Sequence, residues 1–232
     1  MIRIENAEVT GWEAAIRGMR NPMNSWEKSD SHWNGAFDSH TGNPRWYVGE
    51  NDRDLMMRLV AGGPVHAKYR RMLVVYADII APLYWWKEFD TYKVGMVANS
   101  CGTMRKIAEK EFTLEDFSCE HLIRPGDKTY VYIRDDDAEE YWSPFEIFNN
   151  YLLQMLNACR EAYLKTKDKK YWWQMIQLLP SSYNQKRTVM LNYEVLAGIY
   201  PMRKDHKLDE WRYFCHWIKD LPYSEIITGG ME

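Results

Sequence analysis

The sequence predicts a single α+β domain over residues 1–232, and three observations support this prediction. Its 232 residues are enough for one large domain, and 46% of them are apolar, as in a globular protein. Short runs rich in β-branched residues are interspersed with longer segments whose apolar residues recur at helical spacing. Neither an internal repeat nor a Gly/Ser-rich linker interrupts the chain, which favours one domain.

The N-terminal quarter is predicted to contain a strand, two helices and a long loop. The strand and the first, amphipathic helix are expected at residues 2–9 and 11–19. Residues 21–49 are polar and rich in Gly, Asn and Ser, which predicts a loop that holds at most a short turn of helix. Asn51-Asp52 is typical of a helix N-cap, so a short helix is expected at residues 52–60, before Gly62-Gly63-Pro64.

The middle of the chain gives weaker signals. Residues 72–77 are apolar and β-branched and predict a strand, after which Asp78 is expected to cap a helix that runs to about Thr91, with Pro82 near its first turn. A Thr-x-x-Asp capping pattern predicts a short helix at residues 113–117. Residues 128–134 alternate as a strand does, and the acidic run at 135–137 is expected to be solvated.

The clearest helix signal is Ser143-Pro144-Phe145-Glu146. It combines an N-cap Ser, a Pro at the first helical position and a Glu at the third, which is a capping box. Apolar residues then recur at helical spacing as far as the basic turn at residues 165–170, where positive charge complements the helix dipole. Three further helices are expected at residues 171–179, 189–200 and 207–221, the first two of them ended by Pro180 and Pro201.

Charge and cysteine content restrict the class of protein. Thirty basic and thirty-three acidic residues give a net charge of −3, which makes duplex nucleic acid a poor candidate partner but permits a nucleotide-sized anion. The four cysteines are widely spaced and do not resemble a disulfide framework, which favours the reducing cytoplasm. The charged start does not match a signal peptide, and no apolar run reaches the ~20 residues of a membrane span, so a soluble cytoplasmic protein is expected.

Common catalytic motifs are absent, among them the Walker loop, the dinucleotide-binding glycine triad and His-Glu-x-x-His. Cys119-Glu120-His121 could form half of a metal site, but further ligands at a matching spacing are missing, so a structural role is favoured and no metal is expected. The pairs Trp85-Trp86 and Trp172-Trp173 could stack on a flavin or a base, although packing in the core or at an interface is favoured.

Several stretches, taken in order, match one family. Residues 81–88 (Ala-Pro-Leu-Tyr-Trp-Trp-Lys-Glu) follow a predicted strand that His66 precedes, and residues 179–192 contain Leu-Pro, Thr-Val and a final Asn. Residues 203–206 (Arg-Lys-Asp-His) lead into the last amphipathic helix, and residues 12–17 match the opening helix. The chain thereby resembles the flavin-dependent thymidylate synthases.

The resemblance implies a small antiparallel sheet packed with several helices. It also implies a homotetramer that binds FAD and dUMP at a site shared between subunits, takes a methylene group from methylenetetrahydrofolate and uses NADPH to reduce the flavin. Carried over position by position, the family's pattern predicts these residues to contact the cofactor: His66, Lys93, Asn99, Asn192 and Arg203. It predicts these to contact the substrate: Glu88, Ser100, Cys101, Gly102 and Thr103. No catalytic residue is predicted.

The chain departs from the family's signature at its cations. Thr91 and Tyr92 stand where the signature has Arg and His, and Thr103 and Glu194 stand where the family has Arg. Threonine cannot replace the bidentate contact of a guanidinium to phosphate, and a glutamate would repel an anion. The backbone amides of residues 100–103 could still hold a phosphate.

Two functions stay open on this reasoning. One is an FAD-dependent enzyme that methylates dUMP or modifies C5 of a related pyrimidine deoxynucleotide. The other is a catalytically inactive relative that binds a nucleotide or a protein partner. Individual residues also have simpler interpretations: Lys93 as a surface lysine, Cys101 as a buried inert thiol and His66 as a capping or core residue.

Overall fold

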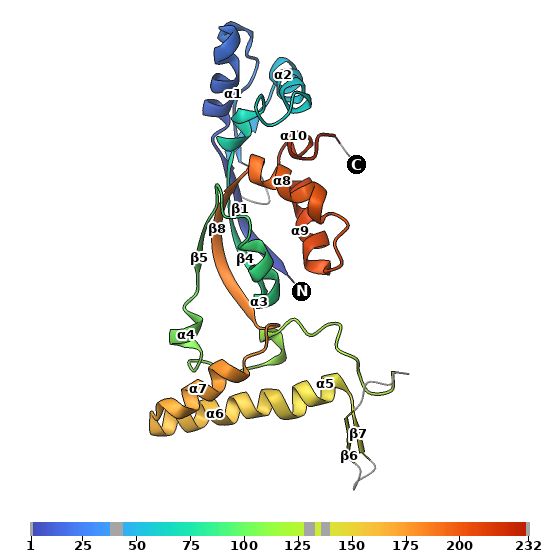
Figure 1. The fold of residues 1–232 in the computed structure, drawn as a ribbon. Coiled ribbons are helices and arrows are strands. Elements are labelled where there is room, and N and C mark those ends of the chain that lie inside the picture. The colour runs from blue at the N-terminus through green and yellow to red at the C-terminus, as the bar shows by residue number, and fades with distance from the viewer. Residues whose placement is uncertain (1, 38–43, 128–132, 136–139, 231–232) are drawn as a thin grey trace. The chain divides into compact units, whose positions relative to one another are not determined.

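A computed structural model of the protein describes residues 2–37, 44–127, 133–135 and 140–230 (Figure 1). A four-stranded sheet has the strand order β1-β4-β8-β5, with antiparallel pairing of β1 with β4 and of β5 with β8. Its strands are β1 (Arg3–Thr10), β4 (Val74–Pro82), β8 (Asn184–Asn192) and β5 (Val97–Ser100). Helices accompany this small sheet, so the prediction of an α+β fold with an antiparallel sheet is confirmed.

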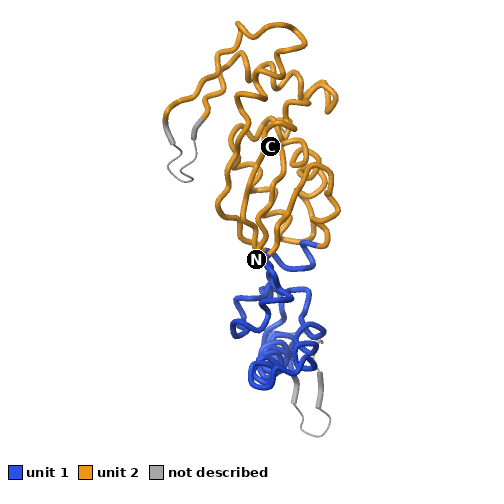
Figure 2. Tube along the Cα trace, turned by 90° about the vertical axis from the view of Figure 1, so that its left-hand side faces the viewer, with its two compact units in different colours: residues 1, 81–86, 101–185 blue, residues 2–80, 87–100, 186–232 orange. Residues whose placement is uncertain are grey.

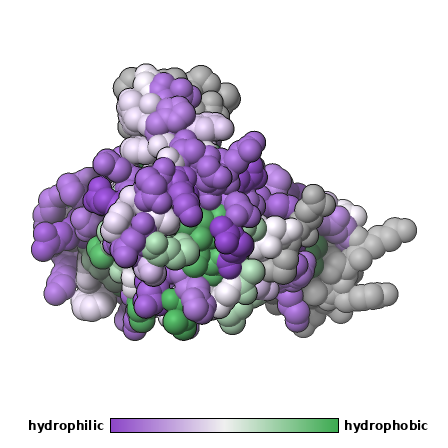
Figure 3. Space-filling model, turned by 90° about the horizontal axis from the view of Figure 1, so that it is seen from above, coloured by the Kyte–Doolittle hydropathy of each residue, from purple (hydrophilic) through white to green (hydrophobic). Residues whose placement is uncertain are grey.

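The chain forms two compact units (Figure 2). Unit 1 contains residues 81–86 and 101–185, and unit 2 contains residues 2–80, 87–100 and 186–232. On the face shown in Figure 3 polar residues predominate around a smaller group of apolar ones, which is the usual surface of a globular chain. The predicted single domain concerns independent folding, which this division does not test, so it stays a prediction.

Unit 2 contains most of the sheet and the helices at both ends of the sequence. These helices are α1 (Trp12–Arg20), α2 (Glu50–Ala61), α8 (Tyr193–Arg203), α9 (Asp209–Asp220) and α10 (Glu225–Thr228). A two-stranded hairpin, β2 (His32–Phe37) and β3 (Pro44–Tyr47), follows two turns of 3-10 helix, Asn21–Met23 and Trp26–Lys28. Fully buried aromatic rings of its core include Phe89, Tyr193, Trp211 and Phe214. The segment predicted as a loop therefore has the short helical turns that were expected and also a hairpin that was not.

Unit 1 is mainly helical. A continuous helical run passes from α5 (Pro144–Glu146) through a π-helical segment (Ile147–Leu152) into α6 (Leu153–Thr166), and α7 (Lys169–Leu178) lies beside α6 (Figure 1). Its remaining elements are α4 (Thr103–Lys106), the 3-10 helix Leu114–Asp116, and the short strands β6 (Ile133–Asp135) and β7 (Glu140–Trp142). A cluster of buried side chains joins these helices: Phe112, Phe117, Phe148, Leu156 and Met175.

Two of the local capping signals, at Ser143 and Thr113, predicted helix starts correctly. Ser143 N donates to Glu146 Oε2 at 2.8 Å and Glu146 N donates to Ser143 Oγ at 3.3 Å, so the predicted capping box is confirmed. The short helix after Thr113 is confirmed as well, because Thr113 N donates to Asp116 Oδ2 at 2.9 Å. The helices predicted at residues 11–19, 171–179 and 207–221 correspond to α1, α7 and α9.

The helix predicted to begin at Asp78 is wrong at its start. Strand β4 continues through Asp78 to Pro82, and α3 (Leu83–Phe89) begins only there. Asp78 instead accepts hydrogen bonds from Thr188 Oγ1 (2.6 Å) and Asn6 Nδ2 (3.0 Å), which lie on the two neighbouring strands. The buried residues at 75, 77, 79 and 81 alternate through this position, which is the pattern of a strand rather than a helix.

The start of the helix predicted at residues 189–200 is also wrong. Val189 and Leu191 are buried on β8, and α8 begins at Tyr193. Pro201 lies inside α8 and does not end it. Strand β5 was not anticipated, and of the strand predicted at residues 128–134 only residues 133 and 134, in β6, are described; the rest, like residues 136 and 137 of the acidic run, lie outside the described residues.

Asp52 does not cap α2, contrary to the prediction. Gly49 is the N-cap residue, and Asp52, the third residue of the helix, is completely buried. The side chain of Asp30 caps the helix instead, because it accepts from Asn51 N at 2.9 Å and Asp52 N at 3.1 Å. A Cβ atom on residue 49 would lie 2.1 Å from Asp30 Cγ, so this arrangement requires glycine there.

The buried Asp52 carboxylate is surrounded by donors. Arg20 Nε donates to its Oδ1 at 2.6 Å, and the hydroxyls of Ser29 and Ser31 each donate to its Oδ2 at 2.7 Å. Burial alone would raise the pKa of Asp52, but the hydrogen bonds from Ser31, Ser29 and Arg20, together with the charge of Arg20, hold that pKa below its usual value. The network fastens residues 29–31 and α1 to the start of α2.

We expect Asp52→Ala to lower the free energy of unfolding by about 3–5 kcal/mol, because it leaves the buried Arg20 without its partner. Ser29→Ala removes one donor and should cost about 1 kcal/mol. Urea unfolding followed by circular dichroism measures both changes. The control is Asp54→Ala, which breaks the exposed Asp54–Arg58 pair (2.9 Å) and should change stability by less than about 0.5 kcal/mol. Equal midpoints for Asp52→Ala and Asp54→Ala would contradict the structural role of Asp52.

Asp78 should make stability depend on pH in the acid range. Hydrogen bonds from Thr188, Asn6 and Lys186 lower the pKa of Asp78 to about 2. A lowered folded-state pKa means that the ionised carboxylate stabilises the fold above the unfolded pKa of about 4, and that this contribution disappears as pH falls toward 2. Asp78→Asn should therefore destabilise the protein by about 2 kcal/mol at pH 7, with a smaller effect at pH 3.

Urea titrations of the two proteins at several pH values test this expectation. Glu5→Gln is the control, since Glu5 faces the same Lys186 at 3.6 Å from a more exposed position. It should change stability little at any pH. An Asp78→Asn effect that does not vary with pH would disprove the assignment.

Candidate functional site

Two of the predicted site residues, Glu88 and Arg203, are in direct contact within unit 2. Arg203, the last residue of α8, places Nη1 2.8 Å from Oε2 of Glu88 on α3. Arg203 Nε donates to the hydroxyl of Tyr92 at 2.8 Å, and Trp211 Nε1 on α9 donates to the same Glu88 oxygen at 2.9 Å. A residue predicted for the cofactor and one predicted for the substrate are thus bound to each other.

Two aromatic rings lie beside the arginine of this ion pair. The guanidinium carbon of Arg203 lies 4.5 Å from the ring centroid of Trp211 and 5.6 Å from that of Tyr92, both within cation–π range. His206 Nε2 lies 3.7 Å from Glu88 Oε2. The Arg203 side chain is 17% exposed and that of Glu88 is 36% exposed, so both remain accessible to a ligand. We refer to Glu88, Tyr92, Arg203, His206 and Trp211 as the Arg203 cluster.

An anion at the Arg203 cluster would meet a guanidinium that already has two partners, Glu88 and Tyr92. A guanidinium presents the same fork of donors to a carboxylate and to a phosphate. A phosphate that approaches Arg203 would therefore compete with Glu88, whose side chain is exposed enough to turn toward water. The resemblance described above assigned Glu88 and Arg203 separately and did not identify Tyr92 or Trp211 as site residues. For Trp211 the one signal in the sequence was the regular apolar face of the last helix.

The remaining predicted cofactor residues lie elsewhere in unit 2. His66 is exposed in the turn after α2, and Lys93 is exposed just after α3. Asn99 lies on β5 opposite Thr188 of β8. Asn192 caps α8, since its Oδ1 accepts from Val195 N at 3.0 Å. A ligand contact from Asn192 would therefore have to come from its Nδ2 group.

The predicted substrate residues fall in both units. Ser100 ends β5 in unit 2, whereas Cys101, Gly102 and Thr103 belong to unit 1. Thr103 N donates to Cys101 O at 2.9 Å, and Thr103 Oγ1 accepts from Gln185 Nε2 at 3.0 Å. The amide and the hydroxyl of Thr103 thus form hydrogen bonds with other groups of the chain. Phosphate binding by residues 100–103 stays a prediction.

Other sequence-based interpretations have clearer outcomes. Cys101 is exposed, so its interpretation as a buried thiol is wrong. Burial raises the pKa of the Cys215 thiol to about 12, which leaves that thiol protonated and inert at neutral pH. Trp85 and Trp86 are completely buried, in agreement with core packing, whereas Trp173 is 44% exposed.

Glu194, which was expected to repel an anion, is neutralised by a neighbour. Its Oε2 lies 3.6 Å from Arg70 Nη1, and the two side chains are 19% and 8% exposed. Thr91, at the place of a signature cation, donates its hydroxyl to the carbonyl of Glu88 at 2.7 Å. These replacements remove positive charge from the region without adding an unpaired negative charge at Glu194.

In the part of the chain that the structure describes, no three His, Cys, Asp or Glu side chains are grouped as metal ligands would be. Within the same residues, every helix is too short or too polar to cross a membrane.

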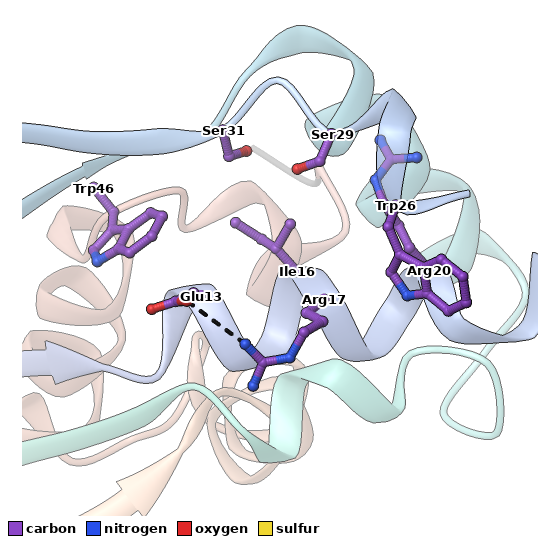
Figure 4. Close-up of a pocket in the computed structure, with 8 residues that line it drawn as sticks. All are labelled: Glu13, Ile16, Arg17, Arg20, Trp26, Ser29, Ser31 and Trp46. Carbon is purple, nitrogen blue, oxygen red and sulfur yellow. Dashed lines mark ion pairs between the residues drawn. The ribbon is translucent and has the colours of Figure 1, made fainter. Parts of the chain in front are cut away.

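Unit 2 also contains a pocket of about 340 Å³ that shares no residue with the Arg203 cluster (Figure 4). In Figure 4 the side chains of Trp46 and Trp26 lie on opposite sides of Ile16. Glu13 and Arg17 of α1 lie along one edge, and Ser29 and Ser31 along the other. Its walls come from α1, the 3-10 helix Trp26–Lys28 and β3.

Comparisons with known proteins give a result for the fold alone. No protein-family model matches the sequence, and no curated protein matches it. Two solved structures of thymidylate synthase X, the flavin-dependent enzyme of Helicobacter pylori, both with FAD and dUMP, do match in three dimensions. One is 14% identical with a TM-score of 0.62 and covers 99% of this chain and 98% of its own. The other is 15% identical with a TM-score of 0.61 and covers 99% and 97%. Over almost its whole length the chain is therefore similar in fold to a flavin-dependent thymidylate synthase.

Proposed function

We propose that the protein is an FAD-dependent, thymidylate synthase-like enzyme that acts on a pyrimidine deoxynucleotide, either by methylating dUMP or by a related modification at C5. The fold supports this proposal because it matches, over nearly both chains, two proteins solved with FAD and dUMP. The observation that carries it is the Arg203 cluster, in which a guanidinium lies beside two aromatic rings and remains partly accessible.

The residues of unit 2 supply groups that suit a flavin nucleotide. Arg203 and the exposed Lys93 would meet its phosphates, and the Nδ2 group of Asn192 and the side chain of Asn99 would donate to its polar edges. His66 is proposed as a further cofactor contact. Bound FAD would supply the hydride chemistry, while these side chains would bind and orient it.

Glu88 sets the main energetic condition on this proposal. A phosphate at Arg203 would share the guanidinium with Glu88, or would replace Glu88 if it gave the guanidinium more than the bond that Glu88 already provides. Stacking on the partly exposed Tyr92 and a contact with the exposed Lys93 are the additional interactions that a nucleotide can make and the Glu88 carboxylate does not. Glu88, Ser100, Cys101, Gly102 and Thr103 stay our proposal for contacts to the substrate.

We also propose NADPH and methylenetetrahydrofolate as co-substrates, a homo-oligomer with the tetramer as the expected state, and a cytoplasmic location.

A second candidate function is a catalytically inactive relative that binds a nucleotide or a protein partner. The loss of signature cations favours this second function, since Thr91 only donates its hydroxyl to a carbonyl near the end of α3 and Arg203 is partly neutralised by Glu88.

FAD binding tests the cofactor site. Wild-type protein incubated with excess FAD and desalted should keep a visible flavin spectrum. Arg203→Ala should weaken FAD binding by about 5- to 150-fold, the equivalent of ~1–3 kcal/mol, because it removes a charge-assisted contact. Arg58→Ala, which removes an exposed arginine on α2, is the control and should bind FAD as the wild type does.

Glu88→Gln gives the matched test of competition. It removes the charge that neutralises Arg203 and keeps an oxygen that can accept from Trp211 Nε1, so FAD should bind more tightly than to the wild type. A colourless wild-type protein, or equal binding by Arg203→Ala and the wild type, would rule out this site for the flavin.

Growth of a thymidine-requiring strain separates the two candidate functions. If the protein is the enzyme, the wild-type chain should restore growth without thymidine and Arg203→Ala should not, because the variant has lost its cofactor contact. A wild-type protein that retains FAD and yet fails to restore growth would disprove dUMP methylation and support the binding role. Expression of each variant is checked by immunoblot, so that loss of protein is not mistaken for loss of activity.

A further inference from the structure

The pocket beside α1 has the composition of a ligand site. Its volume of about 340 Å³ lies within the range of small-molecule sites, roughly 300–1,000 Å³. Trp26 is 49% exposed although it is among the largest apolar side chains, and the buried Ile16 lies between it and Trp46 (Figure 4). Partly exposed indoles around an apolar floor are suited to stacking on a planar ring.

The two tryptophans are held in place before any ligand arrives. Trp26 Nε1 donates to Asn21 Oδ1 at 2.8 Å, which fixes the orientation of its indole. A hydrogen bond from Tyr223 Oη to the carbonyl of Trp46 (3.3 Å) holds the backbone there, and the indole of Trp46 packs edge to face on that of Trp33, with 6.4 Å between the ring centroids. A ligand would therefore lose little free energy in ordering these side chains.

The opposite edges of the pocket differ in hydrogen-bonding character. Along one edge, Glu13 Oε1 and Arg17 Nη1 lie 3.6 Å apart, so this edge offers an acceptor beside a donor. Both side chains are mostly exposed, and such pairs contribute little to stability, so a ligand can take over their bonds cheaply. Along the other edge, Ser29 and Ser31 donate their hydroxyl protons to Asp52, so a ligand finds only acceptor lone pairs there. One lone pair of Ser31 Oγ is already used, because it accepts from Gly49 N at 3.0 Å.

The charges around the pocket cancel. Arg20 is paired with Asp52 at 2.6 Å, and Arg17 is paired with Glu13. A phosphate or a polyanion would therefore find no excess positive charge here. A neutral ring with polar edges fits the pocket better than an anion does.

We propose that this pocket is a second ligand site, which takes a planar heterocycle whose edge carries a carbonyl acceptor next to N–H donors, as guanine does. Arg17 donates to the guanine O6, and the Glu13 carboxylate accepts from N1–H and the N2 amino group. The indoles of Trp26 and Trp46 contact the ring, and Ser29 and Ser31 accept from the sugar hydroxyls. The proposal does not rest on the flavin site, because the two share no residue.

Guanosine is the probe, and adenosine, which lacks the carbonyl, is its matched control. Binding is measured by isothermal titration calorimetry and by saturation-transfer NMR on the full chain. Wild-type protein should bind guanosine at least about tenfold more tightly than adenosine, since an edge built for one hydrogen-bonding pattern disfavours the other. Affinity should change little with salt, because no charge is exchanged.

Three variants test the assigned contacts. Trp26→Ala should weaken both nucleosides about tenfold, as the loss of one stacking partner does. Glu13→Gln should weaken guanosine about tenfold and leave adenosine unchanged, and because Glu13 is exposed this variant is expected to fold. Trp173→Ala removes a similarly exposed indole from α7 of unit 1 and should change neither affinity.

Four results would overturn the proposal. They are an absence of guanosine binding at millimolar concentration, equal binding of guanosine and adenosine, unchanged guanosine binding by Glu13→Gln, and unchanged binding of both nucleosides by Trp26→Ala. Circular dichroism shows whether each variant is folded. A folded Glu13→Gln protein gives a decision even if Trp26→Ala does not fold.

Discussion

A single buried carboxylate, that of Asp52, determines how the N-terminal part of unit 2 is built. An ionised group without water is expensive to bury unless its oxygens receive donors, and Asp52 obtains them from Arg20, Ser29 and Ser31. To supply those donors, residues 29–31 must pass the start of α2, and there Asp30 caps the helix while Ser31 Oγ accepts from Gly49 N at 3.0 Å. One electrostatic requirement thereby positions α1, α2 and one edge of the pocket.

The Arg203–Glu88 pair uses the same chemistry under different solvation. The Arg20 and Asp52 side chains are 4% and 0% exposed, whereas Arg203 and Glu88 are 17% and 36% exposed. Separating the first pair leaves buried charges unsatisfied, while the second pair can exchange its partners for water or for a ligand. The difference in burial is why we assign the first pair to stability and the second to binding.

Features that depend on neighbouring residues were predicted well from the sequence. The capping box at Ser143 closes within three residues, so its geometry is contained in the local sequence. Asp78 also looked like a cap, but its partners Asn6 and Thr188 are 72 and 110 residues away, and they keep it on a strand. Local preference was overridden by contacts that only the folded sheet brings together.

The candidate site also combines features that the sequence predicted with contacts that only the folded structure shows. Resemblance to a family selected Glu88 and Arg203 individually, but it could not show that they are bound to each other across 115 residues of sequence. Tyr92 was identified as a lost cation, and the structure shows it accepting a hydrogen bond from Arg203. A substitution that looks like a loss in an aligned motif can thus provide a different contact, which only the spatial neighbours reveal.

The fold of this chain tolerates changes in sequence better than charged binding residues do, which explains how a thymidylate synthase-like fold can coexist with an altered signature. Buried side chains such as Leu73, Ile79 and Phe89 need only apolar surroundings of suitable volume, so the architecture can be kept at 14–15% identity. Phosphate recognition needs particular cations at particular places, and here Arg203 is partly satisfied by Glu88. A phosphate of the proposed nucleotide would therefore meet a guanidinium whose charge the Glu88 carboxylate already partly neutralises. Additional contacts would favour the ligand, and the partly exposed ring of Tyr92 can offer one, whereas the ring of Trp211 is completely buried.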